Sequence, residues 1–164
     1  MLHPAVAHFA ISLPIISLVL GIAYLIKPSE LMSKISTRFM VFATIFLVVA
    51  FFTGKEDGGE AYALLTSAGK ALLIQHKDLG LYLAIAMGVA TLVKFYGCFK
   101  SNIKAEIFAI VLIAIIAGAT LFQGKMGGEL TYTHGANVEL HSDGMDCLEE
   151  MAEEEAEDEE DEDE

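Results

Sequence analysis

The sequence predicts an all-α membrane protein, namely a four-helix transmembrane bundle with an extra outer interfacial helix and a disordered acidic tail. Two observations support this prediction. Of the 164 residues, 54% are apolar and only 20% are charged, which is too apolar for an ordinary soluble domain. In addition, four segments meet or approach the length of about 20 apolar residues that a membrane-spanning helix needs. The predicted spans are 5–26, 35–53, 79–99 and 103–122.

The net charge of −13 is confined to one end of the chain. Residues 143–164 contain 15 acidic and no basic side chains, whereas residues 1–142 contain 8 acidic and 10 basic ones. We therefore predict a membrane domain over 1–142 and an acidic tail over 143–164. With only two cysteines, the chain is not a disulfide scaffold, and its composition also argues against a fibrous protein, a soluble enzyme or a nucleic-acid partner.

The first span has two interpretations, a retained transmembrane helix or a cleavable signal peptide. No basic region precedes it and no small-residue cleavage site follows a short apolar run, so we predict that it is retained. Basic residues in the first and third connections then favour the cytoplasm for these short loops, with both termini outside. These residues are Lys27, Lys34, Arg38, Lys94, Lys100 and Lys104.

The second connection, 54–78, is expected on the outer side. From Gly58 to Gln75 its apolar residues fall mostly on one helical face, which predicts an interfacial or re-entrant helix before the third span. A linker helix on the bilayer surface and a functional lid are equally open interpretations. Gly58–Gly59 and Gly127–Gly128 are interpreted as turns, and Asp57 as a solvated loop carboxylate.

Histidines are the candidate functional residues. His8 lies among apolar residues of the first span, where an ionisable side chain indicates a functional site unless a backbone carbonyl simply satisfies it. His3, His76 and His134 are predicted near the same membrane face and could join His8 when the bundle closes. Each alone could equally be an interfacial histidine. His141 adjoins the acidic tail and is set aside.

Neutral imidazole suits haem iron, copper, zinc or non-haem iron. Zinc usually takes cysteines or a compact His/carboxylate cluster, and copper favours neighbouring Met and Cys, neither of which accompanies these histidines. Haem b needs one or two histidines from facing helices, an apolar slot and glycine where the macrocycle approaches. The sequence supplies all three, so haem b is the preferred cofactor, with copper or zinc as the alternative. No catalytic constellation competes, which favours electron transfer over an enzyme.

Several motifs resemble the DUF2231 family of bacterial four-span membrane proteins. The opening HPAVAHFAISL is similar to the family's HPxxVHFPIAL, although Ala7 and Ala10 depart from the usual residues, Ala10 standing where Pro is common. QGKMGGELTYTHG after the fourth span is similar to QGxxGGxLxYxHG. Thr53–Gly54, and His76 with Gly80, also fit. The resemblance covers about residues 1–140.

This resemblance implies a bacterial inner-membrane protein whose histidines at one face have been proposed to bind haem. It carries His3, His8, His76 and His134 over as matching motif positions. We predict His8 and His76 as the first ligand pair, and His3 and His134 as a second pair or as groups that orient the first. Quinol or a periplasmic redox protein would be the electron partner. A third hypothesis is a structural subunit that docks a larger complex.

The acidic tail has too few apolar residues to fold alone. Its simplest interpretation is a solvated disordered segment. The functional alternative is electrostatic capture of a basic partner protein or of divalent cations, which salt would weaken.

Overall fold

The computed structural model describes residues 2–136, which fold into four α-helices and no strand. The helices are α1 (His3–Ile26), α2 (Glu30–Tyr62), α3 (Ser67–Lys100) and α4 (Ile103–Tyr132). All four are long and apolar enough to cross a membrane. The predicted four-helix transmembrane bundle is therefore confirmed, and the tail at 143–164 lies outside the described residues.

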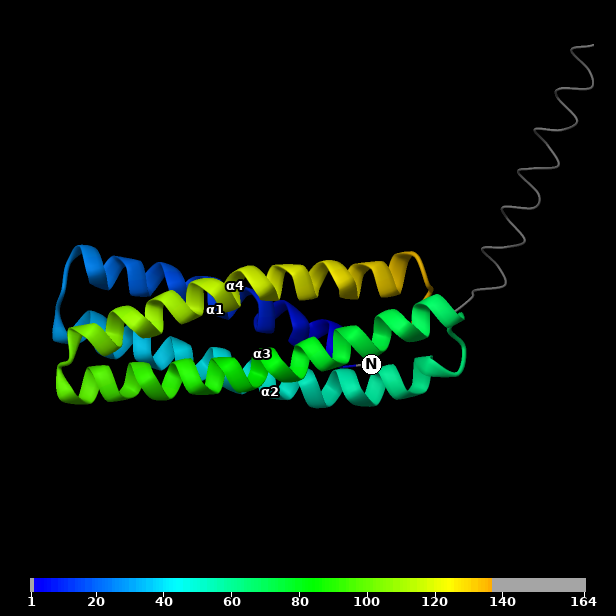
Figure 1. The fold of residues 1–164 in the computed structure, drawn as a ribbon, viewed down its shortest axis with the longest axis horizontal. Coiled ribbons are helices and arrows are strands. Elements are labelled where there is room, and N and C mark those ends of the chain that lie inside the picture. Colours follow the sequence, from blue (N-terminus) through cyan, green and yellow to red (C-terminus); the bar gives the residue numbers. More distant parts are fainter. Residues whose placement is uncertain (1, 137–164) are drawn as a thin grey trace, which may run out of the picture.

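The helices run antiparallel in sequence order and close into a ring (Figure 1). Each helix packs against its neighbours in the chain, and α1 also packs against α4. This arrangement gives the bundle two ends, which we name by their residues. The hairpin end holds the connections 27–29 and 101–102, and the terminal end holds Leu2, the connection 63–66 and Ala136.

The connections at the hairpin end are short because the sequence caps the helices there. The side chain of Ser29 accepts a hydrogen bond from the Met32 amide and so begins α2. Ser101 ends α3 in the left-handed conformation with φ of +51°, and the Asn102 side chain accepts from the amides of Lys104 and Ala105. Two residues are thus enough to turn α3 into α4.

The predicted extra outer helix does not form a separate element. Its residues are divided between the end of α2 and the start of α3, with only 63–66 between them. α2 continues through Gly58–Gly59, and α4 continues through Gly127–Gly128, so neither pair forms the predicted turn. Packing outweighs the low helix propensity of glycine here, since Ala61 and Leu130 beyond these pairs are buried.

Unequal helix lengths distinguish the two ends. α1 has 24 residues, against 33 in α2, 34 in α3 and 30 in α4. Short connections align the helices at the hairpin end. The difference in helix length therefore appears at the terminal end, where the other helices extend roughly 9–15 Å beyond α1. Figure 1 shows the chain beginning part-way along the bundle.

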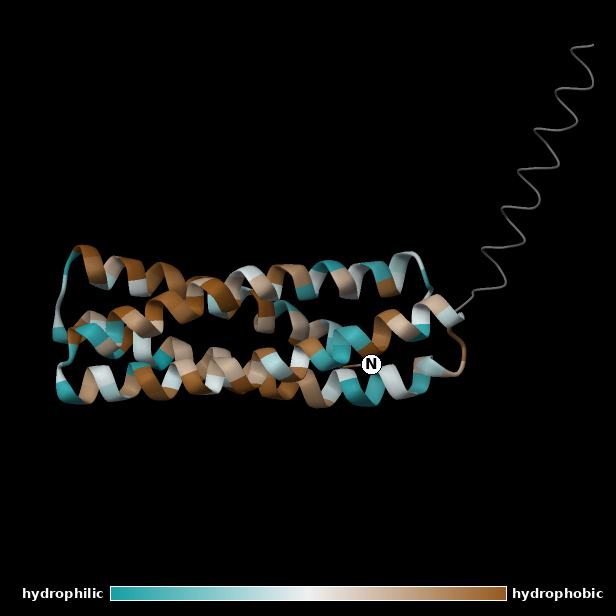
Figure 2. Cartoon of the chain, in the orientation of Figure 1, coloured by the Kyte–Doolittle hydropathy of each residue, from teal (hydrophilic) through white to brown (hydrophobic). Residues whose placement is uncertain are grey.

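Small and apolar side chains fill the interior. Buried alanines let the helices approach closely, and larger apolar side chains face outward, as expected in lipid. Figure 2 shows apolar residues along the length of the helices, with hydrophilic ones gathered towards the ends. The alanines in this core include Ala43, Ala50, Ala84, Ala90 and Ala109.

One ion pair is buried near the hairpin end. Lys94 of α3 pairs with Glu106 of α4, and the two residues are 0% and 2% exposed. The Ser33 hydroxyl of α2 donates to Glu106, and the Lys94 ammonium lies 4.7 Å from the ring centre of Tyr24 on α1. This cluster draws on all four helices. The sequence places Lys94 near the far end of the predicted span 79–99 and counts it with the basic third connection; the structure places it inside the bundle.

Close approach of α3 and α4 brings this pair together. A Cβ atom on Gly97 would lie 2.7 Å from Glu106 Cγ and 2.9 Å from the Glu106 backbone nitrogen. Only glycine fits there without moving backbone atoms.

Removing one member of the pair should destabilise the bundle strongly. Lys94→Met or Glu106→Gln alone leaves the other side chain buried without its charge partner, and we expect each to lower the free energy of unfolding by about 3–5 kcal/mol. The double variant should lose less than the sum of the two. Thermal unfolding in detergent measures this. The exposed pair Lys34–Glu30 is the control, and additive losses at Lys94 and Glu106 would contradict the coupling.

Candidate functional site

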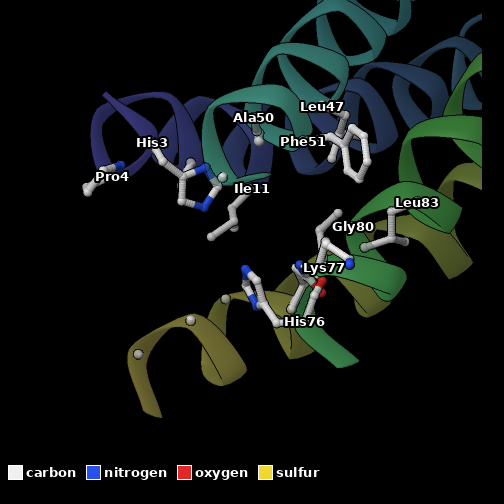
Figure 3. Close-up of a pocket in the computed structure, with 18 of the residues that line it drawn as sticks. His3, Pro4, Ile11, Leu47, Ala50, Phe51, His76, Lys77, Gly80 and Leu83 are labelled. Carbon is white, nitrogen blue, oxygen red and sulfur yellow. Dashed lines mark hydrogen bonds between the residues drawn. The ribbon is translucent and has the colours of Figure 1, made fainter. Parts of the chain in front are cut away.

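A cavity of about 430 Å³ opens at the terminal end, within the size range of small-molecule sites. Residues of all four helices line it (Figure 3). The cavity lies between the first turns of α1, from His3 to Ile11, and the other three helices. Its deeper wall is mostly apolar and includes Ala10, Leu47, Leu83 and Thr120, which are all buried.

Two histidines face each other across this cavity. His3 begins α1 and His76 lies on α3, so they come from helices on opposite sides of the ring. Their ring centres are 6.3 Å apart and their planes are perpendicular. Figure 3 shows both imidazoles extending into the same space.

The ring of His3 rests on Gly54 of α2. A Cβ atom at residue 54 would lie 2.7 Å from His3 Cε1, so any larger residue would displace the ring. Nδ1 of His3 lies 3.3 Å from Thr53 Oγ1. Because the Thr53 hydroxyl donates to the carbonyl of Val49 or Ala50, it accepts from His3 Nδ1. This assigns the proton to Nδ1 and leaves Nε2 with a free lone pair.

The ring of His76 lies against a second glycine, Gly127 of α4, whose Cβ position is 3.3 Å from His76 Cε1. The backbone carbonyl of His76 accepts a 2.7 Å hydrogen bond from Gln123 Nε2, which ties α3 to α4. Within residues 2–136, neither His76 Nδ1 nor Gln123 Oε1 has a hydrogen-bond partner although both atoms are buried. Buried polar atoms normally have one, so both are available to a bound molecule.

Asp57 fixes the position at which α1 begins. Its side chain is on α2 and only 7% exposed, and Oδ2 accepts a 3.2 Å hydrogen bond from the backbone N–H of His3. Leu2, the N-cap residue of α1, makes no side-chain hydrogen bond to that end of the helix. A carboxylate at a helix N-terminus is stabilised by the helix dipole. The prediction of a solvated loop carboxylate was wrong because α2 extends past residue 57 and buries it.

The structure brings three of the predicted site histidines to one cavity. His8 lies one turn after Pro4, is exposed, and lines the cavity beside His3 and His76. Its Nδ1 donates to the carbonyl of Pro4 at 2.6 Å. His134 follows α4, packs against Gly69 of α3 and does not line the cavity. His141 lies outside the described residues.

The donor set of this site is small. In the part of the chain that the structure describes, no group of three or more His, Cys, Asp or Glu side chains could hold a metal ion. What the geometry offers is a pair of opposed imidazoles in a mainly apolar cavity. Such a pair can provide two ligands to a metal whose remaining ligands come from elsewhere.

Comparison with known protein families matches residues 1–140 to the model of DUF2231, described as a predicted membrane protein. The chain belongs to the DUF2231 family. This confirms the resemblance drawn from the sequence motifs, and with four membrane-spanning helices it places this DUF2231 protein in a lipid bilayer. Neither the comparison with curated proteins nor that with solved structures finds a match.

The sequence did not indicate which residues hold the histidines in place, although Thr53 and Gln123 are positions of the family motifs. Thr53, Asp57 and Gln123 act through contacts between helices, which follow from packing register rather than from local pattern. The glycines at 54 and 127 were noted only as motif positions or turns. Nothing in the local sequence around these two glycines indicates that histidine rings pack against them.

Substituting Gly54 should move the His3 ring. In Gly54→Ala the new methyl group would overlap the imidazole, so we expect a clear change in the His3 ring resonances of the ¹⁵N-histidine-labelled protein. Gly59→Ala is the control, because nothing lies within 4 Å of its Cβ position. It should leave His3 unchanged and stabilise α2 by about 0.5–1 kcal/mol. Unchanged His3 resonances in Gly54→Ala would contradict the described contact.

Removing the Asp57 carboxylate should loosen the start of α1. Asp57→Asn keeps an acceptor but loses the charge, and we expect a loss of about 1 kcal/mol, with a larger loss in Asp57→Ala. Hydrogen exchange at the first-turn amides of α1 should accelerate in that order. Asp78→Asn, an exposed carboxylate on α3, is the matched control. Equal protection in all variants would show that Asp57 does not hold this helix end.

Proposed function

We propose that this DUF2231 protein is a membrane-embedded haem b-binding protein, a b-type cytochrome, in which His3 and His76 would hold the iron. The observation that carries the proposal is the pair of imidazoles facing each other across an apolar cavity.

The ring spacing fits a shared metal ion. With metal–nitrogen bonds of about 2 Å and about 1 Å more from each nitrogen to its ring centre, two imidazoles on one metal have centres roughly 6 Å apart. The observed separation is 6.3 Å. The perpendicular planes are compatible with this arrangement, because rotating a ring about its metal–nitrogen bond leaves the nitrogen in place.

The number of donors favours haem over a bare metal ion. Structural zinc sites use four protein ligands and catalytic ones usually three, whereas the described residues offer no group of three. In haem the macrocycle supplies four nitrogens, and the protein adds one or two axial ligands. Copper or zinc held by the same histidines is the alternative, and metal content distinguishes the two.

The surroundings suit each ring to this role. Neutral imidazole is the form that ligates metal, and the Thr53 hydroxyl holds the proton of His3 on Nδ1, so that Nε2 is free. The glycines at 54 and 127 let both rings lie close to helix backbones. A haem bound there would supply one-electron chemistry, while the chain orients the two imidazoles and lines the cavity mainly with apolar side chains.

This assignment changes the pairing that the sequence favoured. The sequence-based hypothesis joined His8 with His76 and His3 with His134. The geometry supports His3 with His76, with His8 as a third imidazole that lines the same cavity. His134 contacts Gly69 instead, so we assign it no ligand role.

We further propose that the terminal end faces the periplasm of a bacterial inner membrane, where quinol or a periplasmic redox protein would exchange electrons with the haem. Lys55, Lys70, Lys77 and Lys125 lie near the terminal end, so under the positive-inside rule this orientation is supported by the slightly larger number of basic residues near the hairpin end. Those at the hairpin end are Lys27, Lys34, Arg38, Lys100 and Lys104. Lys94 no longer contributes, because it is buried in the bundle.

Absorption spectroscopy of the purified protein tests the proposal. After expression with haem supplementation we expect a Soret band, and an α-band on reduction. His3→Ala and His76→Ala should abolish or greatly reduce haem content, and His134→Ala is the matched control that should retain it.

Three results would count against this assignment. A colourless wild-type protein would refute haem binding. Stoichiometric copper or zinc without iron would favour the alternative. Loss of haem in His8→Ala but not in His3→Ala would restore the pairing of His8 with His76.

A further inference from the structure

A second, smaller cavity adjoins the histidine cavity. It has a volume of about 180 Å³ and lies between the end of α2 and the start of α3. Gly54, Lys55, Leu73 and Lys77 line both cavities, so the two are adjacent. We call this smaller space the side cavity. A molecule held between the two histidines would reach it by passing these shared residues, of which Lys55 and Lys77 are exposed side chains.

Glycines of α2 leave room in the side cavity. Gly54, Gly58 and Gly59 contribute backbone but no side chain to its wall. A Cβ atom on Gly58 would lie 3.1 Å from a methyl of Leu73, whereas one on Gly59 would meet nothing within 4 Å. The space is thus bounded on one side by helix backbone, and its chemical character comes from the other residues around it.

Two lysines give the side cavity a positive charge. Lys55 follows Gly54, on which the His3 ring rests, and Lys77 follows His76, so one lysine adjoins each side of the histidine site. Among the described residues, neither lysine forms an ion pair, unlike Lys34 and Lys94. Both are exposed, so their ammonium groups can stay solvated while they meet an anion.

We propose that Lys55 and Lys77 bind the carboxylate groups of the ligand held between His3 and His76, with its carboxylate-bearing edge in the side cavity. This inference rests on the proposed function, since haem carries two propionate groups on one edge of an apolar ring system. The histidine cavity receives the apolar body, and the side cavity receives the two charges. Charge-assisted contacts of this kind are stronger than those between neutral groups.

Comparing haem with its dimethyl ester tests the proposal, because the ester blocks both carboxylates and keeps the iron and the ring. The full-length protein, purified from haem-deficient cells, is titrated with each compound and followed by absorbance. Wild type should bind haem about tenfold more tightly than the ester. Lys55→Gln/Lys77→Gln should bind haem about tenfold more weakly and the ester unchanged. Lys125→Gln, at an exposed lysine that lines neither cavity, is the matched control.

The outcomes separate this inference from the function on which it rests. Binding of haem and ester with equal affinity by wild type would overturn the role of the lysines and leave haem binding intact. So would an equal loss for both compounds in the double variant, which would indicate a structural effect. Binding of neither compound by wild type would refute the proposed function itself. Recovery of haem affinity in Lys55→Arg/Lys77→Arg would support the role of positive charge.

Discussion

The buried contact between Lys94 and Glu106 is the interaction on which the arrangement of the bundle depends. An ionisable side chain inside an apolar bundle has to find its partner there, and this pair engages α3 and α4 directly, α2 through Ser33 and α1 through Tyr24. Together with two very short connections, it aligns all four helices at the hairpin end. Differences in helix length therefore appear at the terminal end, where the cavity lies beside the first turns of α1.

Three histidines at the terminal end each pack against a glycine of another helix. His3 rests on Gly54, His76 on Gly127 and His134 on Gly69, each on the helix next to its own in the ring or in sequence. A flat ring laid against helix backbone is restrained by contact, without a rigid network of hydrogen bonds. Thr53 and Gln123 add one polar contact each, at the His3 ring and at the backbone of His76. The rings of His3 and His76 are consequently held in place where they line the cavity.

Hydropathy was enough to predict four spans and their order, because length and apolar content are local properties. The continuation of α2 and α4 was not predictable in this way: Gly58–Gly59 and Gly127–Gly128 have the composition of turns, and packing against neighbouring helices keeps them helical. The sequence likewise indicated which histidines gather at one end. It could not predict which histidines face each other, because that depends on how the start of α1 packs against α2. The contact that joins them there is with Asp57, which lies 54 residues from His3 in the sequence.

The cavity wall joins the first helix of the chain to the last. His3 and Ile11 come from α1, Gln123 and Gly127 from α4, and these two helices pack directly against each other. A nascent chain that has inserted only three helices therefore has an incomplete wall, however well its early hairpin is formed. Capture of any molecule that needs both sides must await synthesis of α4 and closure of the ring. Occupancy of the cavity would then report that assembly in the membrane is complete.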